Sequence, residues 1–213
     1  VSSAASDVYK RQVMGYQMAA WTAKAGFSVS VYNRSSNVSE KWVKKFGGKN
    51  FSEPSELAET CDVVFICVGR DEDVLEVTSG KNGVFHTIKP GSLIVDHSTT
   101  SANLSRELGA IANQLNCNFI DAPVSGGEKG AIDGKLAIMC GGSSESFNLA
   151  KSIMECYATK ISLMGPHGSG QLCKMVNQIC IAGLLQGLSE GVNFAKNAGL
   201  DVVSINDVTP LPH

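Results

Sequence analysis

Short apolar runs alternate with amphipathic segments along most of this chain, and this alternation constrains the fold more than any other feature. Val63–Val68 is a continuous apolar run, typical of a strand buried on both faces of a parallel sheet. We expect strands at 27–33, 63–68, 92–96, 118–122, 136–140 and 160–164, and helices at 14–26, 38–46, 55–60, 71–79, 102–115 and 144–157. The pattern predicts an α/β protein with an open, doubly wound, mostly parallel sheet covered by helices on both faces.

A turn-rich hinge at 165–170 precedes a long helical segment that reaches about Leu200. We therefore expect two parts, 1–165 as the sheet domain and 166–213 as the start of an all-α domain. Within the helix, Lys174 precedes Asn177 by three residues and Gln178 by four. Such spacing places the three side chains on one helix face. An amine and two amides there can hold, polarise and protonate a small oxygenated molecule.

Small residues recur every four positions farther along this helix, at Gly183, Gly187, Gly191, Ala195 and Gly199. Each glycine inside a helix costs about 1 kcal/mol relative to alanine, so the stripe indicates close packing of another backbone. The other positions are apolar nearly all round, which is typical of a buried helix. The covering surface would come from the sheet domain, a partner chain or further sequence. The segment therefore also fits a non-catalytic module that binds a partner through this helix.

The composition excludes several classes of protein. A formal net charge of −2 without a basic block gives no reason to expect a nucleic-acid partner. No apolar run is long enough for a membrane span, and residues 1–12 lack the apolar core of a secretory signal. The seven cysteines form no CxxC pair, so we expect buried free thiols in a reducing compartment, the cytoplasm. The four histidines lack metal-ligand spacing.

A dinucleotide site is expected where the first strand turns into the first helix, because backbone N–H groups and the helix N-terminus bind the pyrophosphate there. Val13, Met14 and Gly15 lie at the start of the first predicted helix. If Gly15 is the third glycine of a GxGxxG turn, Lys10 and Gln12 occupy the positions of the first two. The first strand would cover about residues 3–8, where the sequence is atypical. The other interpretation is that Gly15 only begins a helix.

The second predicted strand ends at Asn33, followed by Arg34 and Ser35. An acidic residue commonly contacts the ribose hydroxyls of NAD at this point. The planar guanidinium of Arg34 suits a 2′-phosphate instead. We therefore favour NADP, with NAD as the alternative. A solvated surface arginine fits the position about equally well.

Two further segments follow strands at the edge where open sheets bind ligands. Ser125, Gly126 and Gly127 can turn successive N–H groups toward a carboxylate, although an ordinary glycine turn has the same sequence. The segment 96–99 ends in Thr99, and its hydroxyls would touch a nicotinamide or cap the next helix.

Three long segments resemble the β-hydroxyacid dehydrogenases. They are 121–127 (DAPVSGG), 130–142 (GAIDGKLAIMCGG) and 168–178 (GSGQLCKMVNQ), and the resemblance covers roughly residues 13–203. The family includes 3-hydroxyisobutyrate dehydrogenase, tartronate semialdehyde reductase, and succinic semialdehyde and glyoxylate reductases. The resemblance implies a Rossmann-type domain, hydride transfer between NAD(P) and a small 3-hydroxy acid or its semialdehyde, and an intact protein that is at least dimeric.

The resemblance also implies residue roles. Lys174 would be the catalytic acid/base, and Asn177 or Gln178 would orient the reacting oxygen. The substrate carboxylate would be held by Ser125, Gly126 and Gly127, and the cofactor would be lined by Val68, Gly69 and Thr99. The chemistry agrees, because the nicotinamide supplies only a hydride and the alkoxide needs a proton. A desolvated lysine has a lowered pKa, nearer to the operating pH.

The sequence departs from the family pattern at both ends. The glycine turn before Val13 is absent, and the helical domain stops after its first long helix, where the family continues for roughly another third of its length. We therefore expect a fragment with foreign sequence at both ends, with weak turnover or none.

Overall fold

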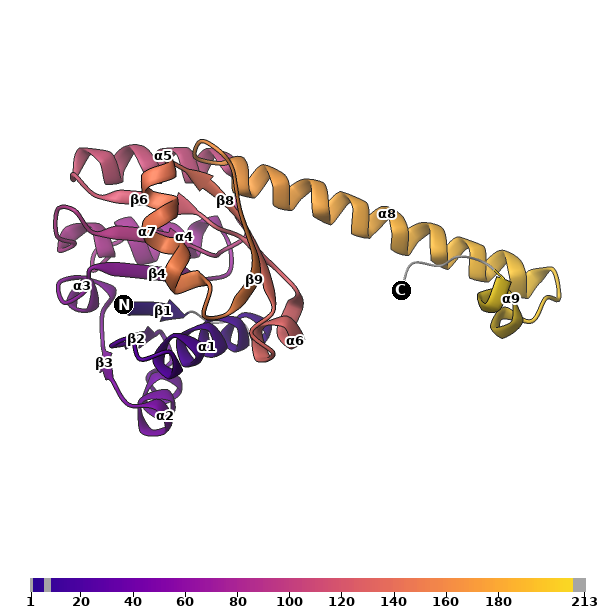
Figure 1. Cartoon of the computed structure of the whole chain (residues 1–213), viewed down its shortest axis with the longest axis horizontal. Helices are drawn as coiled ribbons and strands as arrows, with labels where there is room; N and C mark the ends of the chain where they lie inside the picture. The colour runs from indigo at the N-terminus through magenta and orange to yellow at the C-terminus, as the bar shows by residue number, and fades with distance from the viewer. Residues whose placement is uncertain (1, 6–8, 209–213) are drawn as a thin grey trace. The chain divides into compact units, whose positions relative to one another are not determined.

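The computed structural model describes residues 2–5 and 9–208, and Figure 1 shows the chain. The chain divides into two compact units, residues 1–174 and 175–213. Within the described residues, the first unit holds one nine-stranded sheet with strands in the order β3-β2-β1-β4-β5-β6-β8-β7, and β9 pairs with β8. The strands are β1 Ser2–Ala5, β2 Ser30–Asn33, β3 Lys49–Phe51, β4 Val63–Cys67, β5 Leu93–Asp96, β6 Asn118–Asp121, β7 Val124–Ser125, β8 Leu136–Gly142 and β9 Ala158–Gly165.

The run from β3 to β6 is parallel throughout, whereas β8 is antiparallel to β6 and β7 and parallel to β9. The expected open, mostly parallel sheet is therefore confirmed. Every residue of β5 is buried, and four of the five residues of β4 are buried, as a strand covered on both faces requires. Because the strands from β3 to β6 run the same way, their carboxyl ends share one edge of the sheet.

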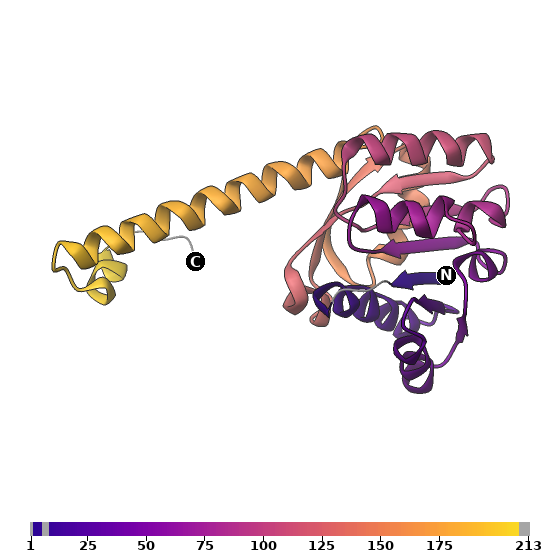
Figure 2. The same ribbon diagram turned by 180° about the vertical axis from the view of Figure 1, so that it is seen from behind.

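Helices cover both faces of this sheet. They are α1 Tyr9–Lys24, α2 Ser36–Phe46, α3 Pro54–Ala58, α4 Asp71–Ser79, the 3-10 turn η1 Val84–His86, α5 Ala102–Gln114, α6 Gly127–Ile132 and α7 Ser144–Met154. Val64 and Ile66 of β4 join one apolar cluster with side chains of α3, α4 and α5. Phe65 and Cys67 join another with side chains of α1, α6 and α7. Successive strand residues thus point to opposite faces, and Figure 2 shows α4 and α5 in front of the sheet.

The atypical segment at the N-terminus contains a strand. β1 pairs in parallel with β2 and β4, with Ser2 opposite Ser30 and Val64. The backbone of β1 forms hydrogen bonds with the two neighbouring strands, and this pairing does not need large apolar side chains. The hydrophobic pattern of the sequence therefore did not indicate a strand here. The helix begins at Tyr9, so positions 10 and 12 are helical and do not form a turn. Residues 6–8, between β1 and α1, lie outside the described residues.

Five short elements were absent from the sequence prediction: β3, β7, α6, η1 and α9 (Val202–Val208). Each has seven residues or fewer, too short to show a hydrophobic period. Two predicted elements are shorter than expected, since β2 begins at Ser30 and α7 ends at Met154. The other predicted strands and helices are confirmed within a few residues of their expected ends.

The second unit is helical. α8 (Ser169–Asn197) begins in the first unit and continues through the boundary, and α9 follows it. Within the second unit, an apolar groove of about 740 Å³ is lined by Gly183, Leu184, Gly187, Leu188, Gly191, Val192, Ala195, Val202, Val203 and Ile205. Among the helices of the described part, none combines the length and apolar character needed to cross a bilayer. None of the seven cysteines forms a disulfide within the described part of the chain, and four of them are buried.

Candidate active site

The carboxyl ends of four parallel strands form the edge at which the predicted site residues gather. β5 lies between β4 and β6, with Asp96 opposite Ile66 on one side and Asp121 on the other. Val68 and Gly69 follow β4 directly and are buried, whereas Thr99 follows β5 and is exposed. The structure therefore brings these three predicted cofactor residues to one edge, the position where open α/β sheets bind ligands.

Buried polar atoms without a partner also gather at this edge. In the described part of the chain, three buried side-chain nitrogen or oxygen atoms have no hydrogen-bond partner: Asn33 Nδ2, Asp96 Oδ2 and Thr100 Oγ1. Asn33 ends β2, Asp96 ends β5 and Thr100 follows β5. Buried polar groups are nearly always paired, so three exceptions at one sheet edge are typical of a site that a polar ligand completes.

Asp96 is fully buried in the middle of this edge. Its Oδ1 accepts from the Ser98 N–H at 2.9 Å, and the Ser98 Oγ accepts from the Val68 N–H at 2.9 Å. Burial raises the pKa of the Asp96 carboxyl to about 7, although the hydrogen bonds from Ser98 oppose the shift. The carboxyl is therefore partly protonated near neutral pH.

His97 ties the end of β5 to the loop after β6. Its Nδ1 lies 2.6 Å from the carbonyl oxygen of Ala122, and its Nε2 lies 2.9 Å from the hydroxyl of Tyr157. Because a carbonyl can only accept, Nδ1 carries the proton and Nε2 accepts from the tyrosine. Burial lowers the pKa of His97 to about 4, so this ring is neutral and structural. It fixes the carbonyl three residues before Ser125.

The predicted carboxylate cradle is an exposed glycine turn at the end of β7. Ser125 ends the strand, and Gly126 and Gly127 have φ angles of 128° and 61°. L side chains rarely adopt these conformations. Both glycines are exposed, and without side chains their backbone is open to a ligand.

Asp121 holds the start of α8 against the sheet. Its fully buried carboxylate accepts from the Gly168 N–H at 2.7 Å and from the Gln171 N–H at 3.0 Å. An anion at a helix N-terminus satisfies the free N–H groups and the helix dipole. Two glycines make this approach possible, because an added Cβ at Gly141 would lie 2.5 Å from Asp121 Oδ1, and one at Gly170 would lie 2.3 Å from the Met139 carbonyl oxygen.

The side chain of Gln171 makes a second attachment between α8 and the sheet edge. It is fully buried. Its Nε2 donates to the carbonyl oxygen of Ser98 at 2.8 Å, and its Oε1 accepts from the Thr100 N–H at 3.1 Å. The sequence analysis assigned no role to Asp121 or Gln171. Both stand in the family-like segments, but only their long-range partners distinguish them from ordinary polar residues.

Lys174 follows Gln171 by one helical turn and is only 8% exposed. Its side chain makes no hydrogen bond or ion pair with the part of the chain that the structure describes, and burial lowers the pKa of its amine. Two apolar neighbours, Leu172 and Val176, are 47% and 60% exposed. This start of α8 therefore buries its polar face, the reverse of an ordinary surface helix. Such an arrangement is typical of a functional lysine.

Asn177 and Gln178 follow Lys174 by three and four residues in the continuous helix α8. Asn177 is half-buried and Gln178 is exposed. Both belong to the second unit, and their expected roles toward the substrate stay predictions.

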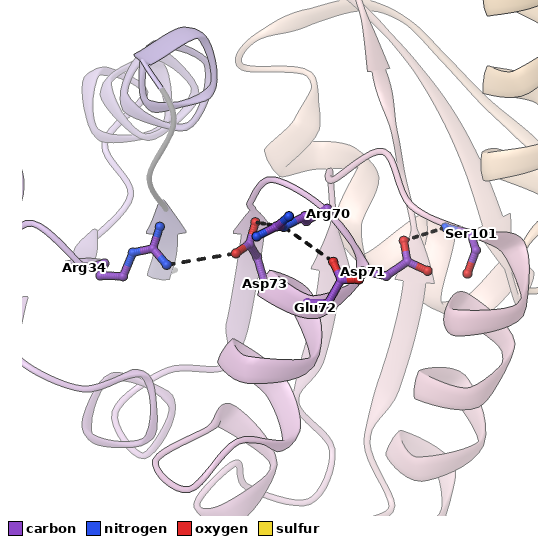
Figure 3. A network of polar contacts seen from close by, with 6 residues as sticks. All are labelled: Arg34, Arg70, Asp71, Glu72, Asp73 and Ser101. Carbon is purple, nitrogen blue, oxygen red and sulfur yellow. Dashed lines mark hydrogen bonds and ion pairs between the residues drawn. The ribbon is translucent and has the colours of Figure 1, made fainter.

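Arg34 belongs to a charged cluster shown in Figure 3. Its Nη1 lies 4.0 Å from Asp73 Oδ1, while Arg70 Nε lies 3.9 Å from Asp73 Oδ2 and 3.5 Å from Glu72. The Asp71 carboxylate accepts from the Ser101 N–H at 3.0 Å.

A cavity of about 150 Å³ lies beside this cluster, lined by Tyr32, Arg34, Glu53, Pro54, Asp73, Glu76, Val77, Lys81 and Asn82. The Asn33 Oδ1 accepts from the Ser35 N–H at 2.9 Å and so fixes the backbone beside Arg34. Arg34 lines this cavity, and its side chain is 47% exposed, so the position fits both a phosphate-binding arginine and a solvated surface arginine.

Met14 and Gly15 lie in the second turn of α1, where Gly15 is buried and Met14 half-buried. One interpretation of the sequence was that Gly15 only begins a helix. The structure does not support it, because Gly15 lies inside α1. Val13 is also helical, and its side chain lies outside what the structure describes. Among the residues with described side chains, no group of three His, Cys, Asp or Glu residues is arranged so that it could bind a metal ion.

Comparison with known proteins gives a consistent result. A sequence model of the NAD binding domain of 6-phosphogluconate dehydrogenase matches residues 12–165. The chain is 46% identical over 196 residues to an uncharacterized oxidoreductase of Shewanella frigidimarina (strain NCIMB 400), covering 92% of this chain and 67% of that protein. It is 35% identical over 193 residues to the 2-hydroxy-3-oxopropionate reductase of Escherichia coli (strain K12), covering 91% of this chain and 65% of that protein.

A solved 3-hydroxyisobutyrate dehydrogenase of Mycobacterium tuberculosis with L-serine superposes with a TM-score of 0.88 at 29% identity, covering 97% of this chain and 69% of that one. The chain spans 56% to 67% of the length of the curated relatives.

Proposed function

Because the chain belongs to the β-hydroxyacid dehydrogenase family, we propose that it is part of an enzyme that transfers a hydride between a nicotinamide cofactor and a small 3-hydroxy acid or its semialdehyde. The observation that carries this proposal is the buried Lys174. Its amine is desolvated, has no partner in the described residues, and follows the two attachments that hold α8 to the ligand-binding edge.

The residues at the edge fit a nicotinamide dinucleotide. Asn33 Nδ2 is a buried donor without a described partner, at the strand end where a ribose is bound in such folds. Beside it, Arg34 lines the 150 Å³ cavity and supplies a cation for a 2′-phosphate. We therefore propose NADP as the preferred cofactor and NAD as the alternative. When bound, the reduced nicotinamide supplies the hydride.

The residues of the chain would provide binding and proton transfer. The backbone of Ser125 and of the exposed Gly126 and Gly127 would hold the substrate carboxylate. Lys174 would donate a proton to the oxygen of the reduced carbonyl, and would accept it in the reverse direction. Its lowered pKa leaves a larger share of the amine neutral near the operating pH, as the reverse reaction requires. Asn177 or Gln178 would orient the reacting oxygen, while Met14, Gly15, Val68, Gly69 and Thr99 would line the cofactor.

A matched pair of lysine substitutions tests this proposal. Lys174→Met keeps the length of the side chain and removes the amine, while Lys196→Met removes an exposed lysine of the same helix. NADPH oxidation would be measured with a panel of semialdehydes. With every semialdehyde that the wild-type chain reduces at a measurable rate, we expect kcat/KM to fall about 10²- to 10⁴-fold in Lys174→Met only, with NADPH affinity retained. A variant that keeps this measurable wild-type rate would refute the role of Lys174.

The predicted weak turnover of this 213-residue chain is tested in the same assay. A rate like that of longer relatives would contradict it. NADPH titration, followed by the fluorescence of the reduced nicotinamide, separates a chain that binds but does not turn over from one that does neither.

A second candidate function is an interaction module, favoured by the apolar side chains that α8 exposes, such as Ile179 at 71% and Leu185 at 58%. Absence of NADPH binding together with stable association through α8 would support it. Homo-oligomerisation of the intact enzyme also stays a proposal. Buried cysteines without disulfides among the described residues agree with a reducing compartment, and cytoplasmic location is part of this proposal.

A further inference from the structure

Gln171 has no part in the chemistry proposed above, yet its side chain is among the largest that are fully buried. Both ends of its amide are bonded to backbone far away in the sequence. The nitrogen donates to the Ser98 carbonyl oxygen at 2.8 Å, and the oxygen accepts from the Thr100 N–H at 3.1 Å. These bonds clamp the backbone on both sides of Thr99, the predicted nicotinamide contact.

The position of Gln171 in α8 relates this clamp to the lysine. Residues three apart share a helix face, and Gln171 and Lys174 are both buried while Leu172 between them is 47% exposed. The Asp121 carboxylate accepts from the backbone N–H of Gln171, so the residue is attached at its backbone to the end of β6 and at its side chain to the loop after β5. A shift of that loop would therefore move the helical turn that carries Lys174.

Asp121 does not perform the same task. Its carboxylate accepts from the backbone N–H groups of Gly168 and Gln171, and these bonds fix where the helix begins. The side-chain amide of Gln171 instead reaches the loop beside the proposed cofactor site, where Thr100 Oγ1 and Asp96 Oδ2 are buried without a described partner. Residues 98–100 therefore lie beside polar atoms that a ligand could satisfy, and they are hydrogen-bonded to α8.

We propose that Gln171 is a positioning residue that couples residues 98–100, at the cofactor edge, to Lys174 on α8. The proposal rests on the roles proposed above for Thr99 and Lys174. Through the two side-chain hydrogen bonds of Gln171, cofactor contacts at residues 98–100 set the orientation of the Lys174 amine. The burial of this amine depends on the same two hydrogen bonds.

The test replaces Gln171 by methionine, which is of similar length and volume but makes neither hydrogen bond. Gln171→Asn keeps the amide on a side chain that is one methylene too short, and serves if the methionine variant does not fold. Gln114→Met, at an exposed position that ends α5, is the matched control. Folding of each variant is checked by circular dichroism and thermal unfolding.

Two measurements on the chain without cofactor decide the outcome. Amide hydrogen exchange at Thr100 should become about tenfold faster in Gln171→Met, because a buried N–H loses its acceptor. The pKa of Lys174, followed by NMR of labelled lysine, should rise toward its ordinary value as the turn loosens and water reaches the amine. A folded variant in which both quantities stay at the wild-type values overturns the proposal, as does an equal change in Gln114→Met.

A third measurement distinguishes this proposal from the proposed function. NADPH should shift the Lys174 resonance in the wild type, and this shift should fall at least about twofold in Gln171→Met at saturating cofactor. A chain that binds no NADPH would count against the proposed cofactor site, while exchange at Thr100 and the pKa of Lys174 would still decide whether Gln171 positions the lysine.

Discussion

The first two turns of α8, residues 169–174, and the remainder of the helix, residues 175–197, use glycine in opposite ways. An added Cβ at Gly170 would lie within 2.3 Å of the Met139 carbonyl oxygen, whereas Gly183, Gly187 and Gly191 have nothing described within 4 Å. At the start of α8, glycine is required by close contact with the sheet. Along the remainder, the described structure gives no steric reason for it.

The side chains differ in the same way. Gln171 and Lys174 are buried at 0% and 8% exposure, while Ile179 and Phe194 are each 71% exposed. The start of this continuous helix is therefore fixed by contacts with the sheet. Most apolar residues farther along the helix are not covered by any described part of the chain. Sequence periodicity alone shows neither fact, because it reports which residues share a face and not what lies opposite.

The largest effect should come from filling the tight space at the start of α8. We expect Gly170→Ala to lower the free energy of unfolding by about 3 kcal/mol, because its Cβ would meet the Met139 carbonyl at 2.3 Å and Asp121 Oδ2 at 2.8 Å. Urea denaturation followed by tryptophan fluorescence measures it. A neutral substitution would show that α8 is not held as closely as described.

The next effect concerns the carboxylate that accepts the N–H groups at the start of α8. Asp121→Asn keeps the volume but places an NH₂ group against one of the two backbone N–H donors. We expect a loss of about 2 kcal/mol by the same urea assay. Asp133→Asn, at an exposed position, is the control and should change stability little. Equal values for the two variants would argue against this anchor.

A pH series tests the polar sheet edge. The pKa of Asp96 in the fold is about 7, above the ordinary 3.8. The fold therefore favours the protonated carboxyl. The stability gained from the protonated form is complete below pH 3.8 and is lost as the pH rises through 7. His97, with a pKa of about 4 against 6.5, acts in the opposite sense and loses stability as pH falls from 6.5 through 4.

Between pH 6 and pH 8, the stability of Asp96→Asn should therefore improve relative to the wild type by about 1 kcal/mol. Unfolding free energies at the two pH values measure this, and Asp133→Asn again serves as control. Parallel pH profiles for Asp96→Asn and the wild type would contradict the assigned burial of Asp96.

The smallest effect should lie in the remainder of α8. Gly187→Ala should stabilise the helix by up to about 1 kcal/mol, because alanine is the better helix former and nothing described lies within 4 Å. Far-ultraviolet circular dichroism during thermal unfolding measures it. A lower unfolding temperature for Gly187→Ala would remove the difference between the two parts of α8, because it would show that another surface packs against these glycines in solution.

The succession of most strands and helices along the chain could be predicted from the sequence, because elements such as β4 (Val63–Cys67) and α4 (Asp71–Ser79) are bounded by clear changes of pattern. The prediction was poor where pattern is weak. β1 consists of small and polar residues, and its formation depends on the two strands beside it, which a local pattern does not show.

For the site, the sequence indicated the loops at the sheet edge and the lysine, but not what holds them. Lys174 and Thr99 were identified by spacing and by family resemblance, and their roles stay proposals. Gln171 and Asp121 were missed as anchors because their partners lie 71 and 50 residues away in the chain. A long-range hydrogen bond leaves no periodic signal in the sequence.

The anchors of α8 described here, Asp121, Gly170 and Gln171, precede the boundary between the units at 174/175. A chimera joined after Lys174 would therefore retain the attachments of the amine whatever helices follow it. In evolutionary terms, lineages could exchange the C-terminal portion while inheriting intact the lysine that we propose as proton donor.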